Sequence, residues 1–233
     1  MKKLFIIVSI VFICFTAIPL FAVDLNLGAA TWYSWWEMES DGGDQDIDPT
    51  ILYGPLVSIG LADNWNLSSV FLYGRFIMKH DEDTGVKEEK VNRFDSDTSL
   101  NYNLSRYFKV FAGLKAMGYS YPSGYNRSAG PAFGLGITLP LGSNFFILGN
   151  LSGMYNYGRT KTMSEEGQET VISNLTAPGV NSTLSLAYYI TSASTTVTLG
   201  GRYQYFEMHY ESERLKDVEL FFYGFTLSVV YSF

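Results

Sequence analysis

Apolar side chains alternate with small or polar ones in about ten separate runs of the chain after residue 22. The clearest run is the last, residues 221–233, where every second position is large and apolar. A period of two places successive side chains on opposite faces of a β-strand, and helical periodicity is weak in the same region. The sequence therefore predicts an all-β fold.

The alternating runs define ten expected strands with turn residues between them. They span residues 24–36, 50–62, 66–78, 93–104, 108–119, 131–141, 145–158, 177–189, 196–207 and 219–233. The connections are short at 63–65, 105–107, 142–144 and 191–195, and long at 37–49, 79–92, 120–130, 159–176 and 208–218. This pattern is typical of an up-and-down barrel with turns in the periplasm and loops outside the cell. Eight strands are the alternative if 24–36 or 177–189 is irregular.

The less apolar face of these strands looks enclosed. It carries mostly Gly, Ser, Asn, Ala and Thr, whereas charged residues, 17% of the chain, concentrate in the loops. After residue 22 no apolar run is long enough for a transmembrane helix, and strands cross lipid only as a closed barrel. We therefore expect a closed antiparallel up-and-down transmembrane β-barrel with a narrow interior filled largely by side chains.

The amino terminus predicts export. Lys2 and Lys3 precede an apolar run from Leu4 to Ala22, the layout of a secretory signal peptide, with an uncleaved anchor as the alternative. We expect a signal peptide at 1–22, a barrel at 23–233 and a destination in the bacterial outer membrane. Cys14, the only cysteine, lies in the apolar run, so no disulfide or thiolate metal site is expected beyond it.

The charge balance limits the expected partners. The chain has 16 Lys and Arg against 23 Asp and Glu, so nucleic acid is not expected, because binding its phosphates needs clustered cations. Asp44, Asp46 and Asp48 have the spacing of Ca²⁺ ligands, but Pro49 stands where an EF-hand has glycine. We expect hydrated acidic loops, with divalent-cation bridging to a lipopolysaccharide-type glycolipid as the alternative. No metal or cofactor is assigned, and the sequence does not identify an extracellular ligand.

Several charged residues are predicted to face the lumen. These are Arg75, Asp95, Asp97, Lys109, Lys115 and Arg202. If a tight turn pairs residues 104 and 108, Asp97 lies opposite Lys115, which would form a favourable cross-strand ion pair. The charges could form a constriction that selects small solutes, or a salt-bridged plug. We favour the plug because an unpaired buried ion is costly.

The segment from Gly224 to Phe233 resembles the β-signal of bacterial outer-membrane proteins, which the barrel-assembly machinery reads. The residues that carry the likeness are Gly224, Leu227, Val229, Tyr231 and Phe233. The resemblance implies insertion into the outer membrane by that machinery. It points to a class of barrels shared by many families and to no single family.

Two short spacings are similar to the omptin family, ten-stranded outer-membrane proteases that use an aspartate pair and an Asp–His pair at the barrel rim. Asp95 and Asp97 would form the first pair, and Glu207 with His209 the second, with glutamate in place of aspartate. The alternation puts the first pair inside and the second outside, so they would not share a catalytic water.

The run 209–212 has the residue types of lipid A acyltransferases and deacylases without a matching motif. We assign no catalytic residue. The expected function is a structural or surface-interaction role through the acidic loops, with a narrow porin and a rim enzyme as alternatives.

Overall fold

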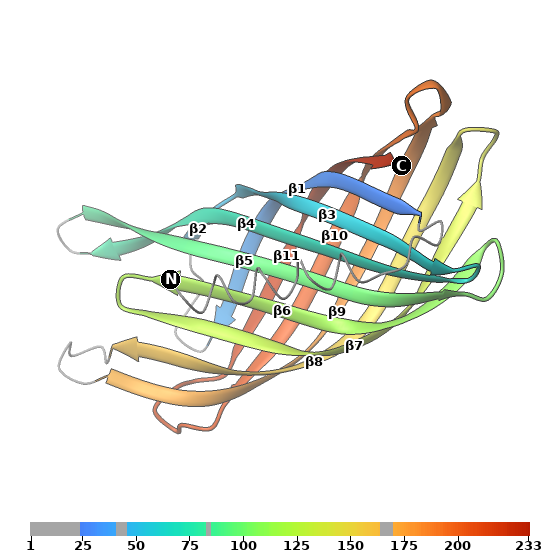
Figure 1. The fold of residues 1–233 in the computed structure, drawn as a ribbon. Helices are drawn as coiled ribbons and strands as arrows, with labels where there is room; N and C mark the ends of the chain where they lie inside the picture. The colour runs from blue at the N-terminus through green and yellow to red at the C-terminus, as the bar shows by residue number, and fades with distance from the viewer. Residues whose placement is uncertain (1–23, 41–45, 83–84, 164–169) are drawn as a thin grey trace, which may run out of the picture.

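The computed structural model describes residues 24–40, 46–82, 85–163 and 170–233, which form a closed antiparallel β-barrel (Figure 1). The predicted signal peptide lies outside the described residues. The strands are β1 (Leu25–Ser40), β2 (Asp46–Asp48), β3 (Thr50–Ala62), β4 (Trp65–Glu82), β5 (Gly85–Asn103), β6 (Phe108–Tyr121), β7 (Gly124–Pro140), β8 (Phe145–Met163), β9 (Thr170–Ile190), β10 (Thr195–Tyr210) and β11 (Val218–Ser232). A 3₁₀ turn, Thr191–Ala193, joins β9 to β10. No helix in these ranges is long and apolar enough to cross a membrane.

Ten strands make up the wall, in the ring order β1, β3, β4, β5, β6, β7, β8, β9, β10 and β11. The last strand closes the ring by pairing with the first, from Asn26 opposite Ser232 to Ser40 opposite Val218. The short β2 pairs with β4 alongside β3 and is separated from β3 by Pro49, which has no backbone N–H to donate. The predicted closed barrel of about ten strands is confirmed.

The outer face of the wall is apolar. Leu135 is 63% exposed, Phe225 63% and Phe233 71%, and they belong to the residue sets that the alternation assigns to one face. The residues at the alternate positions of each strand point inward. Phe222 of β11 is one of them and is fully buried. An exposed apolar surface of this extent is unfavourable in water and favourable in contact with hydrocarbon.

The two ends of the barrel differ. Short turns at residues 63–64, 104–107, 141–144 and 191–194 form one end, called the turn end, at the upper right in Figure 1. Longer hairpins form the opposite, hairpin end. The long loops predicted at 79–92 and 120–130 were wrong, because pairing continues to Glu82 opposite Gly85 and to Tyr121 opposite Gly124.

The lumen changes character along its axis. Its hairpin half holds a buried apolar cluster that includes Trp36, Phe76, Phe206, Met208 and Phe222. Its turn half is lined by small polar side chains such as Ser68, Ser99, Asn150 and Thr183. Charged residues cluster where the two halves meet, and they form the site described next.

Candidate functional site in the lumen

A buried ion cluster is centred on Asp95 of β5. Its carboxylate accepts hydrogen bonds from Lys115 Nζ at 2.5 Å, Arg202 Nη2 at 3.1 Å and Arg93 Nη2 at 3.2 Å. Asp95 is fully buried, and the three cations are also buried. One carboxylate is therefore shared by three cations away from bulk water, and this local excess of positive charge makes Asp95 the residue on which the cluster depends.

The cluster links opposite walls of the barrel. Arg93 Nη2 also donates to Gln204 Oε1 at 3.1 Å, so both Arg93 and Asp95 of β5 bond to residues of β10. In the ring of ten strands, β5 and β10 lie across the full diameter from each other. Side chains thus bridge the lumen at this level.

Aromatic rings pack against the guanidinium groups. Arg93 Cζ lies 3.3 Å from the centroid of the Phe222 ring, and Arg202 Cζ lies 4.6 Å from that of Trp32. Such cation–π contacts strengthen when desolvated. We call the set Trp32, Arg93, Asp95, Lys115, Arg202 and Gln204 the septum.

An aromatic layer covers the septum on its hairpin side. The Trp36 indole lies 5.3 Å from the Phe76 ring, 5.2 Å from Tyr119 and 5.3 Å from Phe222, measured between ring centroids. These four residues come from β1, β4, β6 and β11, which lie along the arc of the ring that runs from β11 through β1 to β6. We call them the aromatic layer.

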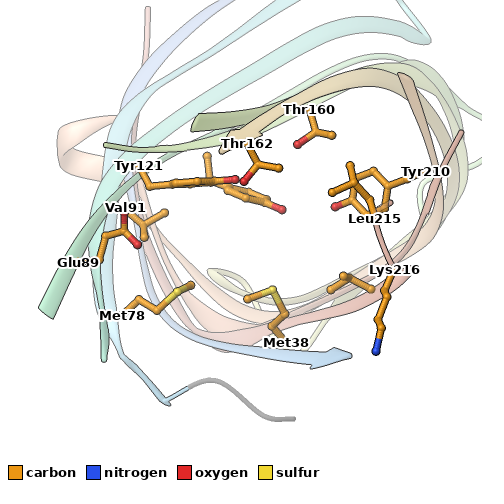
Figure 2. Close-up of a pocket in the computed structure, with 12 residues that line it drawn as sticks. Met38, Met78, Glu89, Val91, Tyr121, Thr160, Thr162, Tyr210, Leu215 and Lys216 are labelled. Atoms are coloured by element: carbon orange, nitrogen blue, oxygen red, sulfur yellow. The ribbon is translucent and has the colours of Figure 1, made fainter. Parts of the chain in front are cut away.

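Two cavities lie on either side of these layers. The inner cup, at the turn end, has a volume of about 210 Å³ and is lined mainly by Ser, Thr and Asn with Asp97, Lys109 and Arg202. The outer cup, at the hairpin end, has a volume of about 330 Å³ and is lined by Met, Val, Leu and Tyr side chains together with Thr160, Thr162, Glu89 and Lys216 (Figure 2). The septum and the aromatic layer lie between them.

The predicted register of the β5–β6 hairpin agrees with the structure, since Asp97 lies directly opposite Lys115. The closest ion pair is a different one. Lys115 Nζ is 3.9 Å from Asp97 Oδ2 but 2.5 Å from Asp95 Oδ1. Asp97 is partly exposed toward the inner cup, whereas Asp95 lies among three cations and attracts the ammonium more strongly.

The predicted lumen charges divide into three groups. Asp95, Lys115 and Arg202 belong to the septum, and Asp97 and Lys109 line the inner cup. Arg75 is on the outer face, where its Nε donates to Asn92 at 2.9 Å, so its prediction as a lumen residue was wrong. Strand β4 is apolar on both faces, and its alternation therefore could not orient Arg75.

Sequence reasoning missed Arg93 and Gln204. Arg93 shares the parity of Asp95, but the expected strand began at residue 93 and its first side chain was not assigned to the lumen. In the structure β5 begins at Gly85, which places Arg93 well inside the strand. Gln204 shares the parity of Arg202, and that parity is the signal that could have identified it.

The two dyads compared with the omptin pattern lie apart. Asp95 is inside, whereas the side chains of Glu207 and His209 are 46% and 42% exposed on the outer face, as the alternation predicts. His209 Nδ1 lies 2.8 Å from Asp217 Oδ2, and this hydrogen bond raises the pKa of His209 above its ordinary value. The imidazole lies between two carboxylates, because its Nε2 is also 3.4 Å from Glu207 Oε1. Ser212 Oγ accepts from the backbone N–H of Arg214.

Some acidic loop residues fall outside the described ranges, among them Asp44 of the Ca²⁺-like spacing. Among the described residues no group of three or more His, Cys, Asp or Glu could hold a metal ion. Asp48 pairs with Lys79 at 2.6 Å.

Comparisons with known proteins give similarity of fold only. No family model and no curated protein matches the chain. Among solved structures, the outer membrane protease OmpT from Escherichia coli has a TM-score of 0.61 at 12% identity, covering 90% of this chain and 97% of OmpT. Outer membrane protein AlkL has a TM-score of 0.43 at 14% identity, covering 89% and 90%. Neisserial surface protein A has a TM-score of 0.40 at 12% identity, covering 90% and 97%.

At these identities a structural match reports how the wall is built and not which residues line it. The match to OmpT extends over almost the whole length of both chains. It agrees with the closed antiparallel ring found here. The chain therefore has the fold of small bacterial outer-membrane β-barrels.

Proposed function

We propose that this protein resides in the bacterial outer membrane as a closed barrel and acts as an interaction protein at the cell surface through its hairpin end. The apolar outer face supports the membrane location, because it would be unfavourable in water. The carboxyl-terminal segment 224–233, which completes the wall beside β1, supports insertion by the barrel-assembly machinery.

The observation that best supports a closed lumen is the set of side-chain hydrogen bonds between β5 and β10. Arg93 bonds to Gln204, and Asp95 bonds to Arg202, across the full diameter of the ring. A hydrated ion needs continuous water along its path, and the aromatic layer adds a second barrier above the septum. Breaking the septum would strand buried charges, which costs several kcal/mol per ion, so we expect the closure to be permanent.

The surface role is supported by charge at the hairpin end. Glu219 of β11 lies directly between Glu39 of β1 and Glu207 of β10 in the pairing register. Carboxylates directly opposite each other repel, so this rim attracts mobile cations from solution without forming a coordination site among the described residues. An anionic glycolipid bridged by divalent cations is the partner that we propose for this rim.

A narrow porin is the second candidate, and one observation favours it. Lys109, Arg202 and Asp97 line the inner cup, which is the lining expected of a path for small ions. In this alternative the septum would have to open.

Recording from refolded protein in planar bilayers separates the two. We expect no steady open level in the wild-type protein. A steady conductance whose ion selectivity changes in Lys115→Ala would refute the closed barrel and establish the porin. Asp63→Asn, in a turn outside the lumen, is the matched charge-removing control.

A further inference from the structure

The outer cup is an apolar cavity in a place where polar side chains are expected. The lumen of an outer-membrane barrel is normally polar because it contacts water, and the inner cup follows this rule. The outer cup is instead lined by Met38, Met78, Val91 and Val218 together with three tyrosines. In Figure 2 the labelled side chains of Met38, Met78, Val91, Tyr121 and Tyr210 project from different parts of the wall into one space.

The floor of the cup is formed by polar contacts of modest strength. The hydroxyls of Tyr119 and Tyr210 lie 3.9 and 3.7 Å from Met208 Sδ, to which they donate. Thr160, on the wall, donates to the backbone carbonyl of Tyr125 at 3.2 Å. Thioether sulfur is a weak acceptor. Tyr210 Oη already accepts from Asn126 Nδ2 at 3.5 Å, whereas the hydroxyl oxygens of Tyr119 and Thr160 keep lone pairs, so the cup presents acceptors to a ligand that carries an O–H or N–H group.

The charge of the cup points to a neutral ligand. Among its lining residues only Glu89 and Lys216 are charged. Lys216 is exposed, and its ammonium points away from the cavity in Figure 2. Glu89 lies on the lumen face directly opposite Met78 and has an interaction of its own, and its carboxylate disfavours an anionic ligand. The surfaces that remain are tyrosine rings and thioethers, and thioethers make favourable contacts with aromatic rings.

The volume sets the size of the ligand. An apolar cavity of about 150 Å³ accepts benzene, and the outer cup has about 330 Å³. It therefore suits a molecule of one or two fused rings and is at the lower end of the range for small-molecule sites.

We propose that the outer cup is a binding site for a small, neutral aromatic compound that carries one hydroxyl or N–H group. The ring system lies between the methionine thioethers and the tyrosine rings, and its donor bonds to a hydroxyl oxygen of the wall. The site is reached from the hairpin end and is separated from the inner cup by the aromatic layer.

The test uses 2-naphthol as the probe and the methionine methyl groups as reporters. Folded protein with ¹³C-labelled methionine methyls is titrated, and Met38→Leu and Met78→Leu variants assign the two signals of the cup. We expect both signals to shift in a saturable way, while the signals of Met117 and Met154, which do not line the cup, stay in place. No saturable shift, or equal shifts of all four signals as expected for a probe dissolved in detergent, would overturn the proposal.

Two further probes test the chemical class. The charged analogue naphthalene-2-sulfonate is expected to bind at least about tenfold more weakly than 2-naphthol, which corresponds to about 1.4 kcal/mol. Equal binding of the sulfonate, or tighter binding of the aliphatic alcohol 1-decanol, would contradict a neutral aromatic ligand.

Matched tryptophan variants test the location. Thr162→Trp places an indole in the outer cup, and Thr183→Trp makes the same change in the inner cup. We expect at least about a tenfold loss of binding in the first only, and equal losses would refute the site. If Thr162→Trp does not fold, the titration of the wild-type protein still tests whether the outer cup binds 2-naphthol.

The site does not require a closed septum, so a conducting barrel that binds 2-naphthol would refute only the proposed function.

Discussion

Replacing Asp95 by asparagine is expected to destabilise the barrel more than any other change of a single lumen charge. Asp95 accepts hydrogen bonds from three cations at 2.5–3.2 Å, and Lys115 and Arg93 are each only 1% exposed. Asparagine keeps the size of the side chain and removes its charge. Arg93 and Arg202 would then be buried without a paired carboxylate, and Lys115 would keep only Asp97 at 3.9 Å.

The magnitude follows from the cost of leaving a buried charge unpaired. Removing one partner of a buried ion pair costs about 3–5 kcal/mol, and here one carboxylate serves three partners. We therefore expect the free energy of unfolding to fall by at least about 3 kcal/mol. The double variant Asp95→Asn/Lys115→Met should recover about 1 kcal/mol or more, because it also removes one stranded cation.

Asp97→Asn is the matched control. Asp97 lies in the same strand with the same parity, but its side chain is 28% exposed and its distance from Lys115 is 3.9 Å. Partly exposed ion pairs contribute about 0–1 kcal/mol, so this variant should remain close to the wild type.

The assay is urea unfolding of the refolded protein in lipid vesicles, followed by tryptophan fluorescence and by the shift in gel mobility between folded and boiled samples. Equal destabilisation by the two substitutions would refute the reasoning, since it would show that Asp95 is no more important than a partly solvated carboxylate. A double variant less stable than Asp95→Asn would contradict the role of stranded cations.

Three further changes test other parts of the structure. Gly224 has φ of 154°, and a Cβ there would lie 1.9 Å from the backbone oxygen of Tyr33, so Gly224→Ala should cost at least about 1–3 kcal/mol of unfolding free energy in urea titrations. Gly153→Ala, with nothing within 4 Å of the added Cβ, should be neutral, and a reversed order would contradict the backbone argument. The His209–Asp217 hydrogen bond raises the pKa of His209 above 6.5 and lowers that of Asp217 below 3.8. Its contribution should therefore be largest between these two ordinary values, be lost as pH rises through the raised pKa of His209, and be lost as pH falls through the lowered pKa of Asp217. In an NMR titration Asp217→Asn should return the pKa of His209 toward 6.5, and an unchanged value would exclude the contact. Deleting Phe233 should reduce the heat-modifiable, folded fraction in the outer membrane without reducing synthesis, and full assembly would refute its role in the assembly signal.

The outer wall could be predicted because it follows from a local rule. Alternation in segments such as 131–141 assigned the lipid-facing row that contains Phe133 and Leu135, both strongly exposed in the structure. The same rule placed Asp95 and Lys115 inside and Glu207 outside. It failed for Arg75, because β4 carries Phe71 and Tyr73 outside as well as Leu72 and Phe76 inside, and two apolar faces give no orientation.

The ends of the strands were harder to predict for a physical reason. Beyond the lipid, both faces of a strand contact polar surroundings, so the contrast between alternate residues weakens even where pairing continues. The hairpins that reach Gly85 and Gly124 were therefore predicted as loops. This error also hid Arg93, which was placed at the edge of its strand.

The septum could not be predicted in full, because its key contacts cross the lumen. Arg93 and Gln204 are separated by 111 residues in sequence, and no local pattern indicates that β5 faces β10. The position of β5 opposite β10 follows only when the number of strands and the pairing of the last strand with the first are both known. The same holds for the outer cup, whose lining comes from distant strands.

The most direct test of the closed barrel is whether a small water-soluble molecule can pass from the outer cup to the inner cup. Spin labels are placed at Thr162 in the outer cup and Ser99 in the inner cup, with Cys14 replaced by serine, and a water-soluble nickel chelate is added only to the side of the membrane that the hairpin end faces. We predict that relaxation increases for the label at 162 and not for that at 99 until the vesicles are made leaky. An immediate response of both labels in intact vesicles would contradict a lumen closed by Asp95 and its partners.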